Sequence, residues 1–357
     1  MDLFIALEKI CKDIGVSRIA EITGYEDQLI YVFQSIRPDS KHLIVDSGKG
    51  ITREKALISC SVEAIERYSA ENYLNQIVDV KIGDIESPIR SQIINNLTPL
   101  SIKCLEGFDF YNPEKKTFIP NDLIRYQNNT SSEYHLRYFR SGTTGFGSHI
   151  NKDKALFSCL IEILERDAIA SKNTKFRVDI DTLPEKFKKY INWIYKVTNK
   201  FNLLYHSSDY DVNTFSTYSS DYEMKGGLIG MGCGYKIEEA LENSLIESIQ
   251  TWLMKVSGSR DDWCFADTNI VNDLSSLKII SWDELKKKRL NYSNKMISDF
   301  EQIIYSLKSK NIKIYAVKIE PFINTYPIVT YKVIIPELKK LEQGNMFTGI
   351  FRSSENS

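Results

Sequence analysis

The sequence predicts an α+β fold: a single domain over residues 1–357, with a mixed or antiparallel sheet and one buried, glutamate-bearing helix pattern that recurs three times. Stretches with helical and with strand periodicity are interspersed along the chain. No long Pro/Gly/Ser linker, low-complexity tract or block of like charge divides it. At 357 residues the chain is also long enough to bury a large core.

Short periodic stretches predict the elements on either side of the repeated pattern. Apolar positions within residues 1–13 predict a short helix that stops near Gly15. Further helices are expected over 187–197 and 296–309. Strands are expected over 28–36, 77–82, 134–139, 201–205, 214–219, 226–231, 312–319 and 327–335. Another short apolar run covers 42–45.

The repeated helix pattern is recognised by its fixed spacing. In each copy a glycine precedes an alanine by eight positions, and polar residues follow the alanine at the same three offsets. The helices are expected near residues 52–74, 152–171 and 237–256. The members are Gly48, Ala56, Ser59, Glu63 and Glu66; Gly147, Ala155, Ser158, Glu162 and Glu165; and Gly232, Ala240, Asn243, Glu247 and Gln250.

The acids of the first two copies lie on helices that are apolar nearly all round, which is typical of a buried helix. Residues at i, i+4 and i+7 fall on one narrow stripe of a helix. A buried carboxylate is rare unless it is paired or bound to metal, because removing its charge from water is costly. Unless a cation lay between them, these acids would repel one another. We therefore expect divalent cations to be shared by Glu63, Glu66, Glu162 and Glu165.

The segment 141–147 is rich in glycine and leads into the second helix. A loop that feeds a helix N-terminus presents backbone N–H groups and the positive end of the helix dipole, which suits phosphate. Many such loops merely turn the chain. The phosphate interpretation therefore depends on the neighbouring carboxylates.

Charge and composition exclude several classes of protein. The chain has 46 basic and 47 acidic residues, a balance that does not favour a nucleic-acid or membrane-surface binder. No apolar run approaches the roughly 20 residues that span a bilayer. The start of the chain lacks the basic and apolar stretches of a signal peptide. We therefore expect a cytoplasmic protein that binds neither nucleic acid nor membrane.

The six cysteines contain no Cys-x-x-Cys pair, so a zinc site or a disulfide framework is not expected. Cys60 and Cys159 occupy the same place in the first two copies, beside the serine. We interpret both as small core residues. The alternative is a nucleophilic role, although no histidine lies near either cysteine in the sequence.

On these residues the chain resembles the YcaO family, whose members carry Ser-x3-Glu-x2-Glu-Arg helices that bind ATP and magnesium. Neither a Walker-type phosphate loop nor the kinase His-Arg-Asp set is present. The resemblance covers most of the chain. It is carried by the segments 13–19, 36–38, 48–52, 63–68, 162–168, 258–262, 326–329 and 335–336.

The resemblance implies ATP and Mg²⁺ as cofactors, and a reaction in which ATP phosphorylates the oxygen of a peptide backbone amide. Mg²⁺ prefers oxygen ligands and shares them with phosphates, so the four acids of the first two copies are its expected ligands. Arg166 and Arg260 are expected on phosphate oxygens, because guanidinium donates in a bidentate fork. Ser59, Glu247 and Gln250 are expected at the nucleotide. Alternatively, Arg67 and Arg166 only pair with glutamates and hold helices together.

Two reactions remain open under this resemblance. A Cys, Ser or Thr side chain of the substrate as nucleophile gives an azoline ring, and external sulfide gives a thioamide. Residues 345–354 contain no Pro-x-Pro-x-Pro motif, and we expect no fused leader-recognition domain. We therefore expect a precursor peptide or protein as substrate, and as partner either a leader-binding cyclodehydratase protein or a TfuA-like protein. A homodimer is also expected. The rival hypothesis is a non-catalytic scaffold that binds nucleotide.

Overall fold

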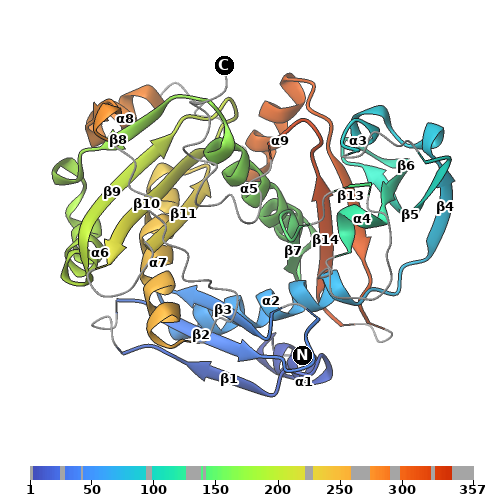
Figure 1. The fold of residues 1–357 in the computed structure, drawn as a ribbon, viewed down its shortest axis with the longest axis horizontal. Coiled ribbons are helices and arrows are strands. Elements are labelled where there is room, and N and C mark those ends of the chain that lie inside the picture. Colours follow the sequence, from blue (N-terminus) through green and yellow to red (C-terminus); the bar gives the residue numbers. More distant parts are fainter. Residues whose placement is uncertain are drawn as a thin grey trace.

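The computed structural model describes residues 3–24, 29–41, 43–93, 99–125, 138–139, 142–221, 228–258, 274–289, 298–322 and 326–339. Its described strands form three sheets. The sheets are arranged around the middle of the molecule, where the three helices of the repeated pattern lie (Figure 1). This is the α+β architecture expected from the sequence. Within the described part of the chain, none of the helices is both long and apolar enough to cross a membrane.

The first sheet is antiparallel and contains β1 (Arg18–Glu21), β2 (Tyr31–Ile36) and β3 (Val45–Gly50). α1 (Leu3–Asp13) packs on α2 (Arg53–Glu71). α2 begins after Thr52, whose side chain accepts a hydrogen bond from Lys55 N. It ends three residues before the expected Leu74, because Asn72 has an extended backbone with φ −140° and ψ 92°. β3 extends past the apolar run 42–45 and includes the glycines of the first copy.

The second sheet joins distant parts of the chain. Its order is β4 (Ile77–Lys81), β5 (Ser101–Asp109), β13 (Tyr315–Ile319), β14 (Val329–Ile334) and β7 (Phe146–His149), with β6 (Asn112–Pro120) beside β5, and these pairs are antiparallel. α5 (Lys152–Ala170) and α9 (Asp299–Ser309) pack on it. The short α3 (Ser87–Arg90) and α4 (Asn121–Ile124) lie near β5. C-terminal strands thus support α5.

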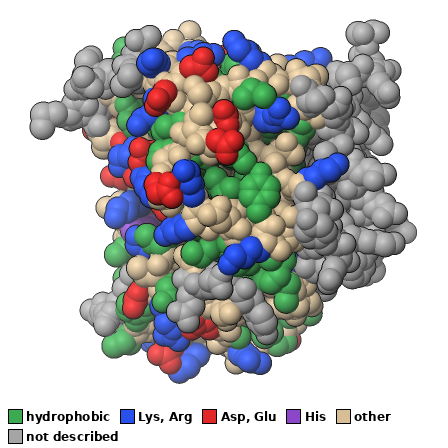
Figure 2. Space-filling model, turned by 90° about the vertical axis from the view of Figure 1, so that its left-hand side faces the viewer, with side chains coloured by type: hydrophobic (Ala, Val, Ile, Leu, Met, Phe, Trp, Pro, Cys, Tyr) green, Lys and Arg blue, Asp and Glu red, His purple; other side chains and the backbone are tan. Residues whose placement is uncertain are grey.

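The third sheet has the order β11 (Leu228–Gly234), β10 (Asn213–Asp221), β9 (Thr198–His206), β8 (Lys175–Val178) and β12 (Ile279–Ile280). β8 and β12 are parallel, and the other pairs are antiparallel. α6 (Glu185–Val197), α7 (Ile237–Val256) and α8 (Trp282–Arg289) share an apolar core with it. On the face shown in Figure 2, basic and acidic side chains are interspersed, in keeping with the nearly neutral chain.

Some expected elements fall partly outside the described residues. These parts are residue 28, residues 134–137 and residues 226–227 of three expected strands, and residues 296–297 of an expected helix. The described parts of the last two correspond to β11 and α9. Residues 138–139, the described end of the expected strand 134–139, are not in a strand. The sequence also did not predict β1, β5, β6, β7, β8, β12, α3, α4 and α8. Among these, a two-residue strand such as β12 and a lysine-rich helix such as α8 carry little periodicity.

Each helix of the repeated pattern packs against the strand that precedes it: α2 on β3, α5 on β7, and α7 on β11. The glycine of each copy lies at the crossing. A Cβ added to Gly48 would lie 1.9 Å from Cys60 N. At Gly147 and Gly232 it would lie 2.5 and 2.2 Å from the carbonyl oxygen of the alanine eight positions later. Only glycine permits such close backbone approach. The glycine-to-alanine spacing therefore has a packing cause.

Candidate functional site

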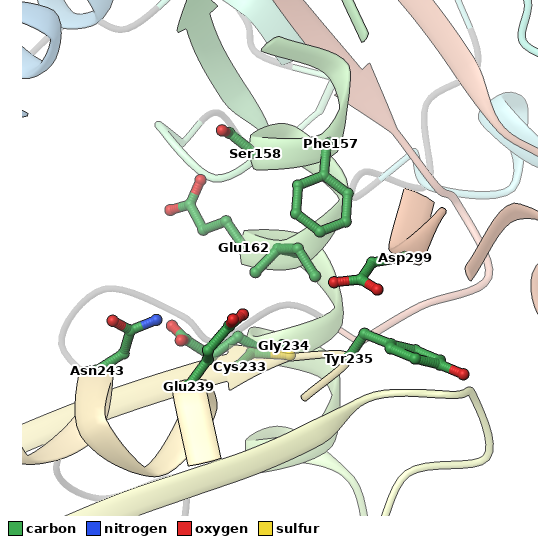
Figure 3. A pocket seen from close by; sticks show the side chains of 11 residues that line it. Phe157, Ser158, Glu162, Cys233, Gly234, Tyr235, Glu239, Asn243 and Asp299 are labelled. Atoms are coloured by element: carbon green, nitrogen blue, oxygen red, sulfur yellow. The ribbon is translucent and has the colours of Figure 1, made fainter. Parts of the chain in front are cut away.

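Two cavities lie against α5. The larger, of about 330 Å³, lies between α5, the junction of β11 with α7, and α9 (Figure 3), and we call it the α5–α7 cavity. The smaller, of about 220 Å³, lies between α2 and α5, and we call it the α2–α5 cavity. Ser158 and Glu162 line both cavities. One polar face of α5 is therefore shared by two neighbouring spaces.

Three acidic side chains line the α2–α5 cavity: Glu63 and Glu66 from α2, and Glu162 from α5. Ser148 N donates to Glu66 Oε1 at 2.6 Å, and Gly145 N donates to Glu162 Oε2 at 2.9 Å. Burial raises the pKa of Glu66 well above its ordinary value, and the charges of Glu63 and Glu162 raise it further. Burial likewise raises the pKa of Glu162. Protons or a cation must neutralise this cluster.

Glu165 faces the α5–α7 cavity, about one turn after Glu162 on α5. Burial raises the pKa of Glu165 to about 8, and the nearby Arg166 opposes the shift. Arg166 Nε lies 3.8 Å from Glu165 Oε1, and Arg166 Nη2 lies 3.9 Å from Glu162 Oε1. These separations are too long for hydrogen bonds, so the guanidinium acts on both acids electrostatically.

The polar positions of α7 are divided between β3 and the α5–α7 cavity. Glu247 forms an ion pair with Lys49 Nζ, and Gln250 Nε2 donates to Ser47 Oγ at 3.0 Å. Asn243 instead lines the α5–α7 cavity, where Figure 3 shows it on the opposite side from α5. The third copy of the pattern therefore docks on the strand of the first copy. Glu247, the acid of the third copy, is paired with Lys49 of this strand.

The structure brings the four predicted metal ligands to these cavities. Glu63, Glu66 and Glu162 surround one cavity, and Glu165 lies in the other beside Arg166. Ser59 lies one turn before Glu63 on α2 and is not among the lining residues of either cavity. Arg260 lies outside the described residues.

The donor set fits Mg²⁺ bound together with a ligand. Within the described residues, no group of three or more His, Cys, Asp or Glu side chains converges as a ready-made metal site. Mg²⁺ is seldom held by an all-protein cage and usually combines one or two carboxylates with water and substrate phosphates. Burial and nearby negative charge push these carboxyls toward the protonated form, and a bound cation would favour the charged form that ligates it.

Sequence reasoning missed several polar residues that shape the site. Lys332 on β14 is 4% exposed, and its Nζ donates to Gly142 O and Thr144 O, each at 2.8 Å. It thereby holds the segment whose Gly145 N contacts Glu162. The available signal in the sequence was a single lysine inside a largely apolar strand, which indicates a buried charge with a specific partner. Lys49 was visible between the two glycines of the first copy.

The cysteines of the repeated pattern are structural. Cys60 and Cys159 are buried where the helices cross β3 and β7. Burial raises the pKa of both thiols, to about 12 for Cys60. A nucleophilic cysteine needs the opposite shift, so the core interpretation fits both residues. Cys264 lies outside the described residues.

Curated relatives match most of the chain. An uncharacterized protein of Methanothermobacter thermautotrophicus is 30% identical over 275 residues, covering 70% of this chain and 68% of the relative. An uncharacterized protein in the tfuA 3′ region of Rhizobium leguminosarum bv. trifolii is 23% identical over 292 residues, covering 73% of this chain and 67% of that relative. The chain spans about two thirds of the length of the curated relatives it matches.

Solved structures and a family model agree on the fold. YcaO from Methanopyrus kandleri, solved with AMPPCP and Mg²⁺, superposes with a TM-score of 0.74 at 16% identity, covering 94% of this chain and 89% of that one. A heterocyclase solved in complex with substrate and cofactor gives 0.67 at 14% identity, covering 94% of this chain and 52% of that one. Because residues 47–339 match the model described as YcaO cyclodehydratase, ATP- and Mg²⁺-binding, this chain belongs to the YcaO family.

Proposed function

We propose that this protein is an ATP- and Mg²⁺-dependent enzyme that phosphorylates a backbone amide of a peptide or protein. The observation that carries the proposal is the acidic α2–α5 cavity, where partly buried glutamates of two helices face one space. The family description supports ATP and Mg²⁺ as cofactors. The Methanopyrus kandleri YcaO, bound to AMPPCP and Mg²⁺, supports the same choice.

In this proposal the partly buried acids of α2 and α5 hold the metal and the arginines hold phosphate. Bound Mg²⁺ would neutralise phosphate charge and the charge that develops during transfer. Its protein ligands would come from Glu63, Glu66, Glu162 and Glu165. Arg166, which lies near the acids of α5, and Arg260 would contact phosphate oxygens through their guanidinium forks.

We assign the remaining predicted residues to the nucleotide. Glu247 and Gln250 contact Lys49 and Ser47 of β3. They would therefore act by holding β3 beside the nucleotide, and Lys49 would add a cation there. Ser59 would contact the nucleotide from the first half of α2.

The product is proposed to be a thioamide, with an azoline as the second candidate. A relative in a tfuA 3′ region favours thioamide formation with a TfuA-like partner. The structural likeness to a heterocyclase favours azoline formation with a leader-binding partner. Both reactions require the same phosphorylated adduct, whose negative charge the metal and arginines would stabilise. They differ in whether the nucleophile is external or part of the peptide.

The proposal is tested by phosphate release and peptide mass. Purified protein is incubated with ATP, Mg²⁺, a candidate precursor peptide encoded near its gene and the neighbouring partner protein, with and without sulfide. We expect phosphate release that depends on the peptide. Thioamide formation adds about 16 Da and azoline formation removes about 18 Da. Loss of about 18 Da at an amide next to Cys, Ser or Thr would overturn the thioamide assignment.

The same assay separates the enzyme from the scaffold hypothesis. A protein that binds ATP but releases no phosphate with any combination of peptide and partner would support a scaffold. Glu162→Gln is the matched control, because it preserves the shape of the side chain and removes its charge. Phosphate release that persists in this variant would come from a contaminant or from a site other than the α2–α5 cavity.

A further inference from the structure

Asp46 is a buried carboxylate that contacts the lining of the α2–α5 cavity through Arg67. It lies on β3, which packs against α2, and is 1% exposed. Its Oδ1 lies 2.6 Å from Arg67 Nε. Among the described residues, neither oxygen of this carboxylate has a hydrogen-bond partner, so its contact with Arg67 is an ion pair. Since a buried acid without its cation is strongly destabilising, Asp46 and Arg67 hold each other in place.

The other charged groups that act on Asp46 are Glu63, Arg37 and Glu71. Arg37 is engaged elsewhere, because its Nη1 lies 2.7 Å from Glu71 Oε2 in a buried ion pair. Arg67 is therefore the cation that pairs directly with Asp46.

Arg67 joins Asp46 to Glu63. Its Nη2 lies 3.0 Å from Glu63 Oε1, and its Nε donates to the same oxygen at 3.1 Å. The Glu63 side chain is 38% exposed, in contrast to the fully buried side chain of Asp46. The Asp46 end of this network of ion pairs is therefore fixed in the interior. The Glu63 end lies at the α2–α5 cavity.

A guanidinium beside an acidic cavity competes with a metal ion for the same carboxylates. Arg67 lines the α2–α5 cavity together with Glu66 and Glu162. Guanidinium pairs readily with carboxylate, and rotation of the Arg67 side chain would bring it toward these two acids. A second, buried acid on the Nε side of Arg67 opposes that rotation.

We propose that Asp46 is a positioning residue for the metal: it holds Arg67 on Glu63 and away from Glu66 and Glu162, the other carboxylates of this cavity that would bind Mg²⁺. The inference rests on the proposed function, because it concerns the same metal site. It assigns Arg67 to orienting a ligand rather than only to holding helices together. Asp46 itself touches neither metal nor nucleotide.

The test measures the Mg²⁺ requirement of nucleotide binding. A non-hydrolysable ATP analogue is titrated into the protein at a series of Mg²⁺ concentrations. Asp46→Asn should raise the Mg²⁺ concentration for half-maximal binding about tenfold or more, the usual effect of disturbing a residue that orients metal ligands. Asp167→Asn is the matched control. Asp167 is 7% exposed and accepts a hydrogen bond from Lys339 N at 2.9 Å, outside both cavities.

A double variant distinguishes positioning from a general structural effect. If Asp46 acts through Arg67, Asp46→Asn should change the Mg²⁺ requirement less than about twofold in an Arg67→Gln background. A full effect in that background would overturn the inference. So would an unchanged Mg²⁺ requirement in Asp46→Asn, or an equal increase in Asp167→Asn.

Two further measurements keep the result interpretable. Circular dichroism of the metal-free proteins reports whether each variant folds. Asp46→Ser also lacks the charge, and it replaces Asp46→Asn if the asparagine protein does not fold. The same increase in the Mg²⁺ requirement is expected for Asp46→Ser. An unchanged Mg²⁺ requirement in that variant would overturn the inference. Wild-type protein that binds no analogue at any Mg²⁺ concentration would refute the proposed function. Wild-type binding with no change in the variants would refute only the role of Asp46.

Discussion

Replacing Glu66 by glutamine separates its role in metal binding from its place in the fold. The glutamine oxygen can still accept the hydrogen bond that Ser148 N donates to Glu66 Oε1 at 2.6 Å. The substitution removes only the ability to carry a negative charge. We expect Glu66→Gln to abolish Mg²⁺-dependent nucleotide binding and to leave the fold intact.

The free energy of unfolding should respond to pH in a defined direction. Burial raises the pKa of Glu66 in the folded, metal-free protein. Between the pKa of an unfolded glutamate and this raised pKa, the folded state holds a proton that the unfolded state has released. The stability of the wild type therefore falls as the pH rises through this range, by at most about 1.4 kcal/mol per pH unit for one proton. Glutamine removes this proton, so the variant should gain stability relative to wild type as the pH rises.

Urea denaturation of metal-free protein between about pH 5 and pH 8 measures this difference. Glu54→Gln is the control, because Glu54 is exposed in the first turn of the same helix. Its stability relative to wild type should not vary systematically with pH. A Glu66→Gln protein that is less stable than wild type by the same amount at every pH would contradict the reasoning, and so would one that retains Mg²⁺-dependent binding.

Three further predictions concern packing and charge. Gly48→Ala should lower the free energy of unfolding by about 1–3 kcal/mol or more in urea denaturation, because its Cβ would lie 1.9 Å from Cys60 N. Arg37→Ala should cost about 3–5 kcal/mol in the same assay, because it leaves the buried Glu71 without its partner. An unchanged unfolding midpoint in either variant would contradict the corresponding argument, on packing for Gly48 and on the buried ion pair for Arg37. Glu165→Gln should abolish Mg²⁺-dependent analogue binding, measured by titration, with an unchanged circular dichroism spectrum. Retained binding would remove Glu165 from the metal site.

The repeated helices could be predicted because their signal is local. Each glycine packs against a helix that starts only a few residues later, so one short segment contains both sides of the contact. The acids of α2 and α5 repeat at helical spacing within the same segments. The ends of the elements were harder to predict: β3 starts at Val45, the last residue of the apolar run 42–45, and continues through the glycines of the first copy.

The partners of these helices could not be predicted, because periodicity reports a buried face and not what covers it. Glu66 receives its hydrogen bond from Ser148, 82 residues away. Lys332 contacts Gly142 across 190 residues. The pairing of β14 with β7, which brings that lysine to the site, leaves no trace in local sequence. The proposed role of Asp46 likewise depends on its ion pair with Arg67 of the neighbouring helix, which local sequence does not reveal.

Isothermal titration of the wild-type protein with a non-hydrolysable ATP analogue, with Mg²⁺ and with chelator, tests the central claim most directly. If the partly buried acids of α2 and α5 hold Mg²⁺ together with nucleotide phosphates, the analogue should bind in the presence of Mg²⁺ and bind far more weakly in chelator. Absence of binding under both conditions, by protein that circular dichroism shows to be folded, would contradict the claim.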